Sequence, residues 1–172
     1  MAKIRFFRCH KTDRATVDVI IEAPEWGRVD LEVLAAQACS ATLAELGLTP
    51  GLFEIALLAC DDARIADLNA DFRDKPQPTN VLSWPAEEID LPLGQTPDLP
   101  DPDPQGPPLE LGDVAIAFQT CAREAEEQNK PLEHHIGHLL VHAMLHLLGF
   151  DHINDPDAAH MEAIETRILA TM

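Results

Sequence analysis

Apolar and polar runs divide the chain into alternating strands and helices. β-Branched and apolar runs predict strands over 15–23, 53–60, 81–84 and 113–118. Alanine- and leucine-rich or amphipathic segments predict helices over 30–46, 61–72, 119–128, from about 131, and from about 155. The last helix is expected to have Asp155 as its cap and Pro156 at its first position. The pattern indicates an α+β fold, with a small mixed β-sheet packed with helices.

Residues 86–110 interrupt this pattern. They contain seven prolines and seven acidic residues, and they show no apolar periodicity. This composition predicts a flexible insert, because it offers too little apolar surface to offset the entropy of ordering the chain. Its acidity would repel a nucleic acid, so we expect it to lie away from any cleft that binds one. With 172 residues, the whole chain is expected to form a single domain that carries this insert.

Charge and cysteine content narrow the function further. The chain has 30 acidic and 12 basic residues, a formal net charge of −18. This balance argues against coating nucleic acid by bulk electrostatics, but it permits an enzyme with a local cationic site. The four cysteines form no CxxC pair, which predicts reduced and mostly buried thiols. Neither a signal peptide nor a membrane-spanning run is evident, so we expect a soluble, cytoplasmic protein without membrane partners.

Histidines concentrate in one apolar helix. Seven of the eight lie between residues 134 and 160, and residues 139–148 are apolar except at the histidines, which predicts a buried helix. His142 and His146 share one face, one turn apart, as two ligands of one metal ion would. Gly149 can end the helix in a left-handed conformation, so that His152 returns to the same ion.

His138 does not fit this ligand set. It lies eight residues before His146, about 12 Å along a helix axis, whereas two nitrogens on one zinc ion lie about 3.5 Å apart. We therefore expect His138 to be a structural residue or to contact one of the metal ligands.

Three histidines without an evident fourth ligand indicate an open, hydrolytic site; the alternative is a histidine-rich core helix without metal. Four histidines are expected at the surface and receive no role: His10, His134, His135 and His160.

The spacing H-x-x-x-H-x-x-G-x-x-H matches that of metzincin proteases, with one departure. Ala143 stands where those enzymes have the glutamate that acts as general base. A hydrolase that combines a metal ion with a cationic clamp fits better than a peptidase. Arg73 and Lys75 are candidates for the clamp, because guanidinium suits phosphate oxygens; a surface ion pair of Arg73 with a neighbouring aspartate is the alternative.

Three blocks of the sequence resemble the YbeY family of bacterial metallo-endoribonucleases. They read LNADFRDKPQPTNVLSWP (68–85), ELGDVAIA (110–117) and HLLVHAMLHLLGFDH (138–152). The resemblance implies a zincin-like α+β fold and single-strand-specific, metal-dependent RNA cleavage. It also implies roles in maturation of the 16S rRNA 3′ end and in late ribosome quality control. The implied partners are single-stranded rRNA, the small ribosomal subunit and the GTPase Era, and no DNA is expected.

The resemblance also assigns residues. His142, His146 and His152 match the three ligands of one zinc ion (Zn²⁺), and Arg73 matches a functionally important arginine of the cleft, taken here as catalytic. Gln77 stands where the family usually has a second lysine, which removes one cation from the cleft. Asp151 either orients an imidazole or caps the turn. Two alternative functions stay open: a metalloprotease-like hydrolase without the usual base, and a non-catalytic ribosome-binding factor with structural zinc.

Overall fold

A four-stranded sheet with the order β1-β2-β4-β3 organises the computed structural model, which describes residues 14–172. β1, β2 and β4 run parallel to one another, and β3 pairs antiparallel with β4 at the edge. The predicted mixed sheet is therefore confirmed. The strands are β1 (Thr16–Ile21), β2 (Phe53–Cys60), β3 (Val81–Pro85) and β4 (Leu109–Ala117).

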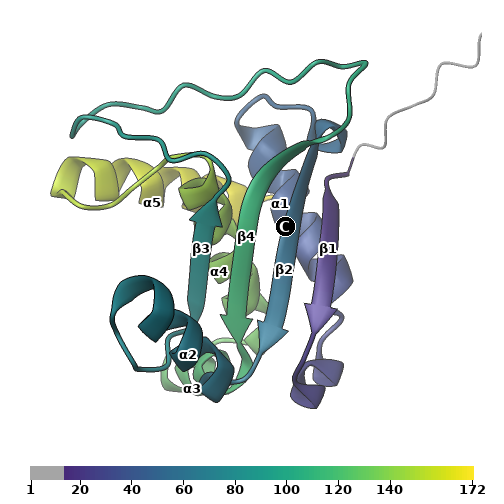
Figure 1. Cartoon of the computed structure of the whole chain (residues 1–172), viewed down its shortest axis with the longest axis vertical. Coiled ribbons are helices and arrows are strands. Elements are labelled where there is room, and N and C mark those ends of the chain that lie inside the picture. The colour runs from purple at the N-terminus through teal and green to yellow at the C-terminus, as the bar shows by residue number, and fades with distance from the viewer. Residues whose placement is uncertain (1–13) are drawn as a thin grey trace, which may run out of the picture.

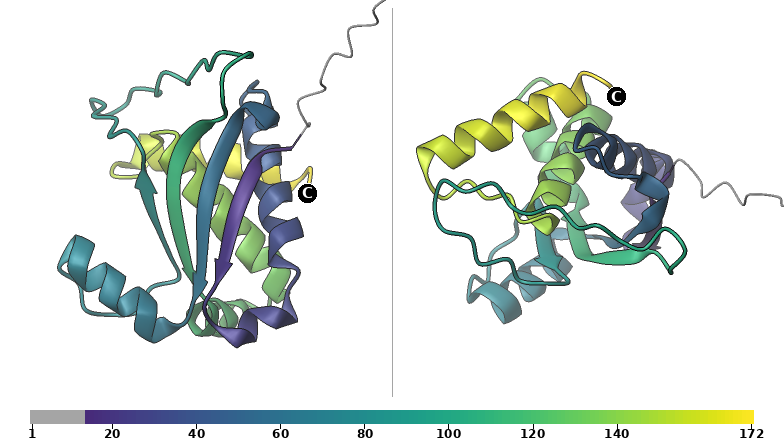
Figure 2. Two further views of the ribbon diagram at one scale, coloured as in Figure 1. Left: turned by 45° about the vertical axis from the view of Figure 1, so that its right-hand side comes forward. Right: turned by 90° about the horizontal axis from the view of Figure 1, so that it is seen from above.

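Helices cover both faces of the sheet. In Figures 1 and 2, α1, α4 and α5 lie on one face, and α2 lies on the other, beside β3. α4 contacts α1, α3, α5 and β3, which makes it the central helix of the core, as its apolar sequence predicts. The helices are α1 (Leu31–Glu45), α2 (Asp62–Arg73), α3 (Phe118–Glu127), α4 (Leu132–Leu147) and α5 (Asp155–Leu169), with short 3₁₀ turns at Pro24–Arg28 and Pro50–Leu52.

Side-chain caps fix where three of these helices begin. The carboxylates of Asp30 and Asp61 accept the backbone N–H groups of residues 33 and 64 at the starts of α1 and α2. At the start of α5, Asn154 accepts the backbone N–H of Asp157 at 2.9 Å. The expected cap at Asp155 is therefore wrong by one position. Asp155 is already helical, and its charge lies in the first turn.

β4 begins four residues earlier than the sequence analysis expects. Its first part pairs with β2 through a bulge, at which Glu54 lies opposite Glu110 and Ile55 opposite Gly112. Gly112 has φ +137°, and a Cβ there would lie 2.1 Å from the carbonyl oxygen of Trp84. Prolines and glycine around this segment suggest a loop, but the bulge lets a strand form there.

The long connection from β3 to β4 crosses one end of the sheet and reaches α5 (Figure 2). It contains no helix or strand between residues 86 and 108. Its backbone N–H at Gly94 donates to Asp157 of α5 at 3.1 Å. Ile89 and Pro97 lie against Gly149, directly after α4. The connection therefore packs on the chain that follows the histidine helix.

Buried thiols agree with the sequence analysis. Cys39, Cys60 and Cys121 are free and buried, and Cys9 lies outside the described residues. Burial raises the pKa of Cys39 to about 12, which leaves its thiol protonated and unreactive at neutral pH. Within residues 14–172, the helices are all too short or too polar to cross a membrane.

Candidate metal centre

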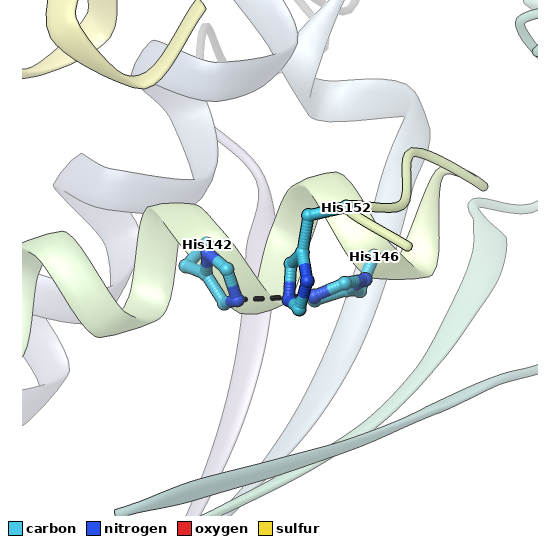
Figure 3. A group of neighbouring side chains, drawn as sticks. All are labelled: His142, His146 and His152. Carbon is cyan, nitrogen blue, oxygen red and sulfur yellow. Dashed lines mark hydrogen bonds between the residues drawn. The ribbon is translucent and has the colours of Figure 1, made fainter. Parts of the chain in front are cut away.

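Three imidazoles converge beside the C-terminal half of α4, as Figure 3 shows. His142 and His146 extend from successive turns of the helix, and His152 returns from the segment that follows it. One nitrogen of each ring lies within 4.8 Å of the others. The ring centroids are 4.6 to 5.3 Å apart. Within residues 14–172, no fourth histidine, cysteine or carboxylate joins this group.

The bend at Gly149 brings His152 back to the helix. Gly149 has φ +92°, and its N–H donates to the carbonyl of His146 at 3.0 Å. The N–H of Phe150 donates to the carbonyl of Leu145 at 3.0 Å. These two bonds form a Schellman motif, which ends a helix at a left-handed residue and reverses the chain. The predicted role of Gly149 is confirmed.

The other ring nitrogens of two histidines have fixed partners. His142 Nδ1 lies 2.6 Å from a carboxylate oxygen of Glu165, and His146 Nδ1 lies 3.0 Å from the carbonyl oxygen of Phe150. Both partners are acceptors, so each Nδ1 carries the proton and each Nε2 presents a lone pair. Each ring is thereby held in the tautomer that a metal ligand requires.

The two Nε2 atoms of His142 and His146 lie 3.0 Å apart and face each other. Two lone pairs at this distance repel each other unless a cation lies between them. Burial, together with the neighbouring rings of His142 and His152, lowers the pKa of His146 to about 4, which disfavours a proton in that role. The donor set therefore fits a divalent metal ion held by imidazoles.

Glu165 of α5 is a site residue that the sequence analysis missed. Its carboxylate is buried, with 7% of the residue exposed, and it contacts both His142 and His138. Burial alone would raise its pKa, but the hydrogen bonds from the two histidines outweigh that effect and lower the pKa to about 2. One signal was available in the sequence: Glu165 shares the apolar face of α5 with Met161, Ile164 and Ile168.

The structure also places the other residues that the sequence analysis discussed. His138 is not among the three converging rings, and its Nε2 lies 3.1 Å from Glu165, so it contacts a partner of His142. Asp151 accepts the backbone N–H of His152 at 2.7 Å, which is the turn-capping role of the two alternatives. The expectation that His135 lies at the surface is wrong, because only 4% of it is exposed.

Arg73 lies beside the histidines in a cleft. It lines two adjoining cavities, and His146 and His152 line both of them as well. Its side chain is exposed and pairs with no other residue in the described part of the chain, so the alternative of an ion pair with a neighbouring aspartate is not observed. Lys75 lines neither cavity.

The acidic connection borders the same cleft. Glu88, Ile89 and Asp90 line one cavity together with Arg73 and His152. The expectation that this segment lies away from the cleft is therefore wrong. Packing of Ile89 against the Gly149 bend explains the difference, because apolar contact with the end of α4 draws the start of the connection to the site.

Comparison with known proteins agrees with this geometry. The sequence model of one family, described as Endoribonuclease YbeY, matches residues 21–172, which include the converging histidines and Arg73. The chain belongs to the endoribonuclease YbeY family. The family assignment rests on most of the chain rather than on the histidine motif alone.

Individual relatives extend over nearly the whole sequence. Endoribonuclease YbeY of Dinoroseobacter shibae is 58% identical over 162 residues, which cover 92% of this chain and 88% of that protein. Endoribonuclease YbeY of Ruegeria pomeroyi is 57% identical over 158 residues, 91% of this chain and 94% of that protein. A solution structure of a Thermotoga maritima protein shares the fold, with a TM-score of 0.58 at 20% sequence identity. The match covers 90% of this chain and 87% of the Thermotoga maritima chain.

Proposed function

We propose that this protein is a zinc-dependent endoribonuclease that cleaves single-stranded RNA in maturation of the 16S rRNA 3′ end and in late ribosome quality control. Membership of the YbeY family gives it an endoribonuclease role in rRNA processing. One observation supports metal-dependent cleavage most directly. The Nε2 atoms of His142 and His146 face each other 3.0 Å apart, with His152 beside them. We further propose that the fold is zincin-like and that the chain is a single metallo-hydrolase domain with one insert. The insert expected at about 86–110 ends at residue 108, because Leu109 and Glu110 already belong to β4.

In this proposal His142, His146 and His152 hold one zinc ion. Zinc supplies Lewis acidity toward a phosphoryl oxygen and lowers the pKa of water that it binds. Glu165 and the carbonyl of Phe150 keep two of the rings oriented. Arg73 binds the scissile phosphate and stabilises the negative charge that develops on it, because its guanidinium lines the cleft and has no partner among residues 14–172.

The proposed partners are single-stranded rRNA, the small ribosomal subunit and the GTPase Era, in the cytoplasm. The net charge of −18 supports recognition at a local site rather than over a broad surface. RNA is favoured over polypeptide as the substrate, because Ala143 occupies the position of the peptidase base and is 1% exposed. A non-catalytic factor with structural zinc is disfavoured because structural sites usually have four protein ligands.

Metal content and RNA cleavage, measured together, test the proposal. Wild-type protein should carry one zinc ion per chain by mass spectrometry and should cleave single-stranded RNA. His142→Ala should lose both properties. His134→Ala is the matched control, because His134 lies on the same helix but is exposed and outside the ring cluster, so both properties should be retained.

Two results would overturn the proposal. RNA cleavage that survives in folded His142→Ala would separate the reaction from the histidines. Cleavage of unfolded polypeptide, but not of RNA, by the wild type would favour the protease alternative. Circular dichroism of each variant shows whether a loss of activity reflects unfolding instead.

A further inference from the structure

The cleft continues beyond the histidine cluster to a second group of polar residues. Asn80, Glu124 and His135, which we call the acceptor bay, line the same cavity of about 560 Å³ as Arg73 and His142. The bay joins three elements: Asn80 precedes β3, Glu124 lies on α3, and His135 lies on α4. A substrate bound at the histidines therefore has a path into the bay.

Two side chains hold the carboxylate of Glu124 in place. Its Oε2 accepts a hydrogen bond from Asn80 Nδ2 at 3.0 Å and lies 2.8 Å from His135 Nε2. Among the described residues, Oε1 has one longer contact, with the same Asn80 amide at 3.3 Å. A carboxylate can accept about four hydrogen bonds, so Glu124 keeps acceptor capacity. Its side chain is 27% exposed, which leaves part of the carboxylate open to the cleft.

The environment of His135 indicates that the hydrogen bonds to Glu124 do more than stabilise the fold. Its Nδ1 is buried and has no hydrogen-bond partner in the described part of the chain, and the residue is only 4% exposed. Because Glu124 is an acceptor, Nε2 carries the proton and Nδ1 is a bare acceptor in the interior. Buried polar atoms of native proteins are nearly always paired, so an unpaired one needs an explanation. Orientation of Glu124 toward a ligand provides that explanation.

The bay lies about two helical turns along α4 from the histidine cluster. His135 and His142 are seven residues apart on one helix, about 10 Å along its axis. A general base must lie within about 3 Å of the proton it removes, or one water molecule away. Glu124 is hydrogen-bonded to His135, so its position suits binding of the nucleotide next to the scissile phosphate, not the reaction itself.

We propose that the acceptor bay binds the nucleobase flanking the scissile phosphate, through an amino group of adenine, cytosine or guanine. The inference rests on the proposed ribonuclease function. A carboxylate repels phosphate but accepts hydrogen bonds from amino groups, as in contacts of Glu with cytosine N4. Unpaired bases present these groups on their Watson–Crick edges. Uracil has no amino group, and its one donor there, N3–H, lies between two carbonyl oxygens that repel a carboxylate. Glu124 thus makes uracil the least favoured base at that position.

Sequencing the ends produced from a randomised single-stranded RNA pool tests this inference. Wild type should disfavour uracil by about tenfold at one position next to the cut, the scale of one good hydrogen-bonded pair. Glu124→Gln should reduce that preference to about twofold or less, because an amide can also donate to a uracil carbonyl. Glu127→Gln is the matched control, because it removes the same charge from the same helix and cavity. Glu127 is exposed, so the base preference of this variant should match that of wild type.

Each outcome separates this inference from the proposed function. Wild-type cleavage with an unchanged uracil preference in Glu124→Gln would overturn the bay and leave the ribonuclease in place. Equal loss of preference in Glu127→Gln would also overturn it, because bulk charge would then explain the effect. No RNA cleavage by zinc-loaded wild type would reject the proposed function itself.

A second variant applies if Glu124→Gln does not fold. Asn80→Ala removes one hydrogen bond that holds Glu124, so it should weaken the preference against uracil. An unchanged preference in Asn80→Ala would overturn the inference.

Discussion

Glu165 holds two imidazoles from one buried carboxylate, and its position decides which nitrogen of His142 faces the cluster. Its two oxygens contact different rings, at 2.6 Å for His142 and 3.1 Å for His138. A residue that accepts a hydrogen bond from the second ring nitrogen of a metal-binding histidine usually contributes about 10- to 100-fold to metal affinity. It does so because it fixes the tautomer and the orientation of the ring. The affinity for metal should therefore depend on Glu165, although Glu165 is not itself among the converging ligands.

Replacing Glu165 tests that dependence. Glu165→Gln should weaken zinc binding by about tenfold, and Glu165→Ala by up to about 100-fold. Competition with a chromophoric chelator measures both affinities. Glu162→Gln is the control, because Glu162 lies on the same helix and in the same cavity as His142 and is exposed, but it is not one of the hydrogen-bond partners of the rings, which are Glu165 and the carbonyl of Phe150. The zinc affinity of this variant should equal that of wild type. Equal affinities in all four proteins would contradict the role given to Glu165.

The same carboxylate should affect stability in acid. The pKa of Glu165 is lowered from its ordinary value of 4.5 to about 2 in the folded protein, so the folded state favours the ionised form. Its contribution to stability is complete above pH 4.5 and is lost as the pH falls from about 4.5 to 2. Metal-free wild type should therefore lose stability more steeply over this window than Glu165→Gln. Urea midpoints from pH 3 to 6 measure the difference, and parallel curves would contradict it.

The turn that ends α4 shows how an element places a ligand. Gly149 and Gly47 occupy the same position in matching Schellman motifs, after α4 and α1. Their φ angles are +92° and +75°. They differ in their surroundings: a Cβ at Gly149 would lie 2.8 Å from Ile89 Cδ1, whereas nothing lies within 4 Å of one at Gly47. A side chain at Gly47 would therefore cause backbone strain alone. A side chain at Gly149 would cause the same strain and would also displace the connection or His152.

Alanine at each glycine should give different results. Gly47→Ala should cost about 1 kcal/mol from its left-handed conformation, which lowers Tm by about 2–4 °C and leaves metal binding intact. Gly149→Ala should lower Tm further and also weaken zinc binding, because Ile89 or the bend before His152 must move. Calorimetry and chelator competition measure the two effects. Wild-type zinc affinity in Gly149→Ala would show that the bend does not control His152.

Local patterns predict these elements better than they predict contacts between them. β2 coincides with its predicted range because its apolar run is continuous, and the helix with the histidines is buried as expected. His142, His146 and Gly149 follow from spacing within one helix and its end. Glu165 and His135 could not be placed in this way, because their roles depend on how α5 and α3 pack against α4. The start of β4 was missed because a bulge is not visible in periodicity.

On the scale of the whole molecule, negative charge opposes the binding of RNA. The formal charge is −18, and the acidic connection brings Glu88 and Asp90 to the cleft. Of the lysines and arginines that the structure describes, Arg73 alone lines the two cavities beside the histidines. Binding should therefore use few phosphate contacts, and its strength should come from the metal, from Arg73 and from contacts with bases.

Salt dependence tests this balance. Each phosphate neutralised on a single strand contributes about −0.7 to the slope of log K against log salt, so one contact at Arg73 predicts a slope near −0.7. Repulsion from the acidic chain is screened as salt rises, which makes the slope shallower still. Fluorescence anisotropy of a short single-stranded RNA at 50–300 mM salt measures the slope, and Arg73→Gln should make the slope shallower. Lys75→Gln removes the same charge outside the cavities and should leave it unchanged. A slope several times steeper would mean that RNA contacts a broad cationic surface, and the local site inferred from the cleft would then account for only part of binding.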